Sequence, residues 1–144
     1  KFLDQEHLEN GEIPRTVDIP THGSILYQNG DERIAPFGVE TTDGGYYYVK
    51  LREVDSKADV INFIVHGGRS LELNVPLGEY EMVYAFGTVW YGEGLLFGDN
   101  TVYSRADETF DFTADDTQVY GWTVELYEQY DGNMVTEVIT ADEF

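Results

Sequence analysis

Residues 87–100 carry the side chains best suited to ligand binding. They hold Trp90, Tyr91 and Phe97 among several glycines and show no regular period. Aromatic faces can stack on sugar rings or hold a peptide, and glycine lets a ligand approach closely. We therefore predict these three as the ligand-binding residues. The competing interpretation is a loop that fills the core, because large aromatic side chains are usually buried.

Acidic side chains gather in the second half of the chain. Calcium takes six to eight oxygen ligands from such groups, and paired carboxylates hydrolyse glycosidic bonds. No calcium-loop spacing is present, however, and 28 acidic residues in 144 make chance clusters expected. The sequence predicts no catalytic residue, no metal and no cofactor. The alternative is an acid-based hydrolase or a metal-dependent binder using residues 87–116. The clustered acids are Asp107, Glu108, Asp111, Asp115, Asp116 and Asp131.

Nucleophilic catalysis has no support in the residue pattern. The chain has no cysteine, so it holds neither a thiol nucleophile nor a disulfide. The histidines, His7, His22 and His66, do not fall at metal-ligand spacing, and no serine lies in a G-x-S-x-G context. We therefore expect a protein that is not an enzyme.

The net charge of −20 narrows the classes of partner. Nucleic acids and anionic lipid head groups are both repelled by such a surface, so neither is an expected partner. No apolar run approaches the ~20 residues that span a bilayer, so we expect no membrane insertion by this segment. The charge favours a soluble monomer. A protein or a glycan is the expected partner.

Alternating apolar residues predict short strands. These strands fall at residues 24–28, 46–54, 60–66, 70–75, 79–86, 109–113, 121–130 and 134–140. Odd-numbered apolar residues from Tyr47 to Val75 and even-numbered ones from Tyr80 to Leu126 should fill one shared interior. The turn spacing and the lack of helical period predict an all-β fold, an antiparallel β-sandwich of about seven to nine strands with meander or Greek-key pairing. Residues 1–21 are expected to form an arm or linker, and 22–144 a single domain.

Residues 71–82 resemble a motif of prealbumin-like sandwiches, which include carboxypeptidase regulatory-like and collagen-adhesin B-type domains. In that motif an apolar strand is followed by Pro-x-Gly-x-Tyr, here Pro76, Gly78 and Tyr80. The glycine is expected to make a tight turn and the tyrosine to enter the core. The wider chain is similar to an uncharacterised family of bacterial exported domains, on residues 90–92, 96–98 and 132–134. That second resemblance implies no activity.

The adhesin-like resemblance also implies a covalent possibility, an isopeptide bond from Lys50 to Asn133 or Asn62. Against it, strand alternation puts Lys50 on the solvent side beside Tyr48 and Arg52.

The expected function is a non-enzymatic exported accessory module, either a spacer or a protein- or glycan-binding domain. We expect it to act outside the cell or at its surface, with a segment before Lys1 as the candidate tether.

Overall fold

The computed structural model describes residues 15–42, 44–126 and 136–144. In this part of the chain no helix is long and apolar enough to cross a bilayer. The predicted turn at 131–133 and the ends of two predicted strands, 127–130 and 134–135, lie outside the described residues. The strands are β1 (Ile25–Gln28), β2 (Ala35–Thr41), β3 (Tyr46–Glu53), β4 (Asp59–His66), β5 (Ser70–Val75), β6 (Gly78–Gly87), β7 (Val102–Ala106), β8 (Phe110–Ala114), β9 (Val119–Tyr120), β10 (Trp122–Leu126) and β11 (Thr136–Val138), with 3-10 helices η1 (Gly98–Asn100) and η2 (Ala141–Glu143).

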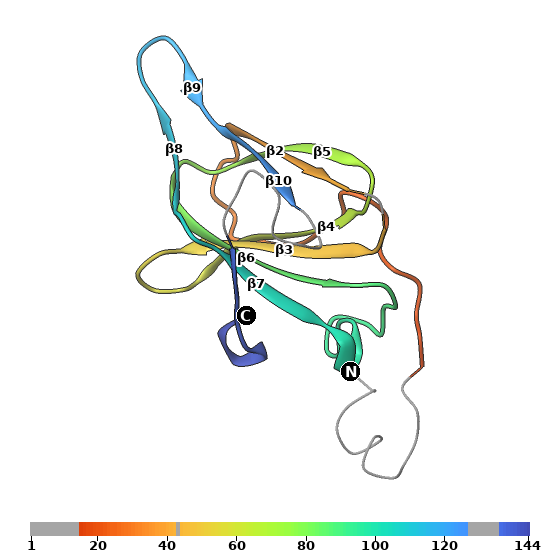
Figure 1. Ribbon diagram of the computed structural model, residues 1–144. Helices are drawn as coiled ribbons and strands as arrows, with labels where there is room; N and C mark the ends of the chain where they lie inside the picture. Colours follow the sequence, from red (N-terminus) through yellow and green to blue (C-terminus); the bar gives the residue numbers. More distant parts are fainter. Residues whose placement is uncertain (1–14, 43, 127–135) are drawn as a thin grey trace.

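These strands form two sheets, which confirms the all-β sandwich (Figure 1). The larger sheet has the order β1-β4-β3-β6-β7-β11; β8 pairs with the first residues of β6 and with β9. The smaller sheet has the order β10-β2-β5. Among the described strands every pairing is antiparallel except β2 with β10, which is parallel. The expectation of purely antiparallel pairing is wrong at that one pair, because the chain enters β10 from the β8–β9 hairpin rather than from a neighbour in the small sheet.

The interior between the sheets is filled as the alternation predicts. Tyr47, Val49 and Leu51 of β3 face it, as do Tyr80, Met82 and Tyr84 of β6, and all six are buried. Phe37 of β2 makes edge-to-face contacts with Phe63 and Phe112 from the opposite sheet, at ring-centroid distances of 6.2 and 5.6 Å. Such pairs contribute about 0.5–1.5 kcal/mol beyond area burial. Burial of these rings holds the two sheets face to face.

A second apolar cluster covers the outer face of the larger sheet. Tyr48 and Ile64 lie beneath Trp90 and Phe97, which come from the loop after β6. Ile19 packs into the same cluster, and the Val17 N–H donates to the carbonyl oxygen of Trp90 at 3.0 Å. Further along the chain, the Gly23 N–H donates to the carbonyl oxygen of Ile64 at 2.8 Å, at the edge of β4 where β1 pairs. The expectation that Tyr48 and Arg52 face solvent is therefore wrong, since both are buried by segments from other parts of the chain.

The turn between β5 and β6 has the geometry expected of the Pro-x-Gly-x-Tyr motif. The Tyr80 hydroxyl donates towards the carbonyl oxygens of Pro76 and Leu77, both 2.9 Å away. Gly78 has a φ of +151°, and a Cβ there would lie 2.8 Å from that hydroxyl. Burial raises the pKa of Tyr80 to about 12. This turn fixes where β5 ends, and β5 forms one wall of the candidate site.

Candidate functional site

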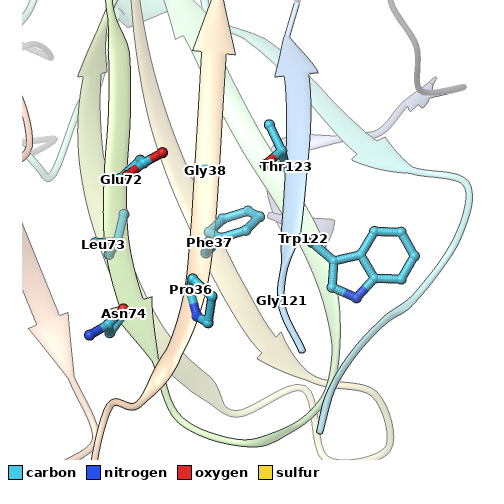
Figure 2. A pocket seen from close by; sticks show the side chains of 9 residues that line it. All are labelled: Pro36, Phe37, Gly38, Glu72, Leu73, Asn74, Gly121, Trp122 and Thr123. Atoms are coloured by element: carbon cyan, nitrogen blue, oxygen red, sulfur yellow. The ribbon is translucent and has the colours of Figure 1, made fainter. Parts of the chain in front are cut away.

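A groove of about 470 Å³ crosses the outer face of the smaller sheet (Figure 2). Its volume lies within the range of small-molecule sites, about 300–1,000 Å³. Three neighbouring strands contribute to it, so its shape is fixed by backbone pairing rather than by a loop. The lining residues are Pro36, Phe37, Gly38, Glu72, Leu73, Asn74, Gly121, Trp122 and Thr123.

The groove exists because the central strand lacks bulk on its outer face. Gly38 lies opposite Glu72 of β5 and opposite Thr123 of β10. Figure 2 shows the side chains of Glu72 and Thr123 on either side of the Gly38 position. A Cβ on Gly38 would lie 3.1 Å from the Thr123 hydroxyl oxygen, closer than ordinary contact. Gly38 is therefore the floor, and the flanking side chains are the walls.

The walls carry hydrogen-bonding groups and no cation. Glu72 supplies carboxylate acceptors, Asn74 a carboxamide that donates and accepts, and Thr123 a hydroxyl that does both. Strands lie about 4.8 Å apart, so Glu72 and Thr123 are separated by roughly 9.5 Å across β2. The arrangement can surround a polar ligand that offers hydroxyl groups on more than one side. A phosphate or carboxylate ligand would meet Glu72 with no compensating charge in the lining.

One end of the groove is closed by a tight approach of β10 to β2. A Cβ on Gly121 would lie 1.9 Å from the carbonyl oxygen of Pro36. Next to it, the Trp122 indole N–H donates to the carbonyl oxygen of Asp111 at 2.8 Å, and its ring meets Phe110 edge-to-face at 5.0 Å. The strand that carries Thr123 is thus held both to β2 and to β8.

The sequence analysis did not predict this groove, although the side chains of both its walls can be identified from the sequence. The alternation of residues 70–75 and 121–126 already places Glu72, Asn74 and Thr123 on an outer face. What was missing is the strand between them, β2, which carries Gly38. The outward polar residues of two strands become a site only when a third strand joins them.

The three predicted ligand-binding residues lie on the other sheet, away from the groove. Trp90 and Phe97 are buried in the outer cluster, with their rings edge-to-face at 5.2 Å. Tyr91 is half-buried, and its ring would lie 2.9 Å from a Cβ on Gly98. The structure therefore brings these three residues together, and their contacts are mainly packing contacts within the loop and with the sheet. Trp90 lines a surface depression, which residues 16–19 also border. Ligand binding by the set stays a prediction.

The acidic residues of the 87–116 region are spread along the chain, and Asp111 lies within β8 itself. Asp107 and Glu108 precede β8, whereas Asp115 and Asp116 follow it, so strand rise alone separates the two groups by more than about 15 Å. Within the described ranges, no three His, Cys, Asp or Glu side chains come close enough to hold a metal ion. Asp131 lies outside the described residues.

The Asp115 side chain stabilises the β8–β9 turn. Its carboxylate accepts from the backbone N–H groups of Thr117 and Gln118 and from the Tyr120 hydroxyl, at 2.8–2.9 Å. These donors, the Thr117 N–H first, hold the pKa of Asp115 well below its usual range. The carboxylate is therefore occupied in holding the hairpin that leads the chain from β8 into β10.

Lys50 and Asn62 are paired across β3 and β4, and each has another partner. The Lys50 Nζ donates to the carbonyl oxygen of Phe144 at 3.0 Å and lies 4.1 Å from the centroid of the Phe144 ring. The Asn62 Nδ2 donates to Asp59 at 3.1 Å. Burial lowers the pKa of Lys50. Asn133, the other candidate for an isopeptide bond with Lys50, lies outside the described residues.

We expect no isopeptide bond at Lys50, because its amine is already engaged by a carbonyl oxygen and an aromatic face. Intact-mass spectrometry of the purified protein should give the mass of the unmodified sequence. A Lys50→Arg variant, which cannot form the bond, serves as the control. A wild-type mass lower than the sequence mass by one ammonia, restored in that variant, would contradict the prediction.

In comparisons with known proteins, no protein-family model, no curated protein and no solved structure matches the chain. The site is therefore interpreted from its own residues.

Proposed function

We propose that the domain is a non-enzymatic binding module that holds a neutral glycan in the groove across β10, β2 and β5. The observation that carries the proposal is the polar lining around a glycine floor, with Glu72 and Asn74 on one wall and Thr123 on the other. Sugars present hydroxyl groups that donate and accept in several directions, and these side chains offer both functions.

Charge supports a neutral rather than an acidic ligand. No Lys, Arg or His of the described ranges lines the groove, and the whole chain carries a net charge of −20. An anionic ligand would meet repulsion from a distance as well as in the groove. A neutral saccharide meets neither, and its affinity would come from hydrogen bonds made on a preformed surface.

We further propose that the module acts outside the cell, in line with the acidity and the tyrosine-rich strands. The alternative, carboxylate chemistry in the 87–116 region, has weaker support because these acidic side chains are spread over β8 and the turns on either side of it. A spacer without a ligand has weaker support too, because a pure spacer does not need a polar groove built by three strands.

A Gly38→Ala variant tests the proposal. The added methyl group occupies the floor of the groove. Its carbon would lie 3.1 Å from the Thr123 hydroxyl oxygen, so this hydroxyl must move aside. We expect wild-type protein to bind neutral oligosaccharides on a glycan array, and the variant to lose about tenfold in affinity, roughly 1.4 kcal/mol.

Gly94→Ala is the matched control, because a Cβ at Gly94 meets no atom within 4 Å. It should bind as the wild type does. An array on which no neutral glycan binds, or equal binding by Gly38→Ala and wild type, would contradict the proposal. Binding confined to a peptide array would replace the glycan with a protein partner.

A further inference from the structure

The depression beside Trp90 forms a second pocket, separate from the groove. It lies on the outer face of the larger sheet, between residues 16–19 and the loop after β6, and has a volume of about 520 Å³. The Val17 N–H donates to the carbonyl oxygen of Trp90 at 3.0 Å, and Ile19 packs into the outer cluster. Residues 16–19 are therefore held against the loop, and the pocket between them is preformed. We refer to it as the arm pocket.

Two aromatic rings of the arm pocket are held in place by neighbouring rings. Trp90 meets Phe97 edge-to-face at 5.2 Å and Tyr48 at 6.2 Å. Tyr46 meets His66 edge-to-face at 5.0 Å. Rings fixed in this way need no reordering when a ligand arrives, so little side-chain entropy is lost on binding.

The arm pocket also holds an unpaired negative charge. Asp18 lines it and is exposed, and within the described part of the chain it has neither an ion-pair partner nor a hydrogen-bond partner. Among the residues that the structure describes, no basic side chain lines the pocket. A carboxylate beside Tyr46 and Trp90 is the combination that attracts a cation, since the face of an aromatic ring is also electronegative.

We propose that the arm pocket binds an organic cation, an alkylammonium or trimethylammonium group, against the half-buried ring of Tyr46 and next to Trp90, which is only 5 % exposed, with Asp18 as the counter-charge. The pocket is too large for a bare metal ion, and one carboxylate supplies too few ligands for calcium. Its apolar lining, Val17, Ile19 and Val89, suits the alkyl part of such a ligand. The net charge of −20 raises the local concentration of cations.

The two tryptophans of the chain allow a direct test by NMR. Choline, added to the wild-type protein, should shift the indole N–H resonance of Trp90 in a saturable way. The indole resonance of Trp122, which lies on the other sheet, should stay in place and serve as the internal reference; a Trp122→Phe variant assigns the two signals. The neutral isostere of choline, with a tert-butyl group in place of trimethylammonium, should cause no saturable shift.

Asp18→Asn removes the charge from an exposed position and should lower the affinity for choline about tenfold. Asp116→Asn, an equally exposed aspartate at the β8–β9 turn, should leave it unchanged. A blocked trimethyllysine peptide, titrated in parallel, separates a protein side chain from a free small molecule as the source of the cation. Absence of a saturable shift with either cation, equal binding of the neutral isostere, or unchanged affinity in Asp18→Asn would overturn the proposal. None of these results depends on the glycan groove.

Discussion

A Gly121→Ala variant should lose about 3 kcal/mol of unfolding free energy, although the change adds only one methyl group. The added Cβ would lie 1.9 Å from the carbonyl oxygen of Pro36 and 2.8 Å from its carbonyl carbon. Both atoms belong to the backbone of β2, so no side-chain rotation relieves the overlap. The two strands must separate locally, which weakens the parallel pairing that starts at Phe37 and Trp122.

Urea unfolding at neutral pH measures this effect, and the Gly94→Ala variant is the control. Its Cβ enters open space, so its unfolding free energy should stay within about 0.5 kcal/mol of the wild type. The same Gly121→Ala protein should also bind less ligand in the groove, because Thr123 moves with β10. A variant that unfolds at the wild-type urea concentration would mean that β10 does not approach β2 so closely.

The part of the fold that the sequence predicts well is the part that depends on local pattern. Alternation identifies which side chains of β3, β4 and β6 face the interior, and Tyr47, Phe63 and Met82 are all buried there. Period-two burial is a property of each strand alone, so it can be found without knowing which strands pair. The Pro-x-Gly-x-Tyr turn is equally local, since Tyr80 bonds to carbonyls three and four residues away.

The strand β2 was not predicted, because its own sequence contains two strand breakers. Pro36 cannot donate a backbone hydrogen bond, and Gly38 has no side chain to pack. Pro36 is tolerated because pairing with β10 begins only at the next residue, Phe37. Gly38 is accommodated between its neighbours on β5 and β10. Both explanations depend on a partner strand more than eighty residues away, which no local window contains.

The function of the aromatic loop could not be predicted for a similar reason. The sequence identifies residues 87–100 as unusual, but not the surface that the loop covers. Trp90 packs on Tyr48, whose outward direction is known from alternation, yet the contact itself depends on the path of the loop over β3. Arg52, which the sequence alone leaves on the solvent side, is likewise covered by a distant segment, since its guanidinium donates to the main-chain oxygens of Glu143 and Phe144.

An Arg52→Met variant should lose about 3 kcal/mol, because it breaks a buried ion pair. Arg52 and Glu81 are each only 7 % exposed, and the Nε–Oε2 distance is 2.6 Å. The Arg52 guanidinium also donates to the carbonyl oxygens of Glu143 and Phe144, at 2.7 and 3.0 Å. Methionine keeps most of the apolar stem, so the loss reports on the charge and its hydrogen bonds. The Lys57 Nζ lies 2.9 Å from the Glu81 Oε1. This second ion pair remains in the variant, so the loss of unfolding free energy should not be larger.

Arg105→Met is the matched control, because Arg105 pairs with the exposed Glu137 at the edge of the same sheet. Exposed pairs contribute at most about 1 kcal/mol, so this variant should unfold almost as the wild type does. Equal losses in the two variants, measured by urea unfolding, would show that the Arg52–Glu81 pair is not stabilised by its enclosure.

The loss in Arg52→Met should also depend on pH, and the direction follows from Glu81. Burial alone would raise the pKa of Glu81, but the hydrogen bonds and charges of Lys57 and Arg52 outweigh it and lower the pKa below 4.5. A carboxyl with a lowered pKa stabilises the native state above its unfolded pKa and loses that contribution as pH falls through its native pKa. The difference between wild type and Arg52→Met should therefore be largest near neutral pH and shrink as the pH falls below 4.5. A difference that stays constant over that range would assign the effect of Arg52 to its contact with the carbonyl oxygen of Glu143, which does not titrate.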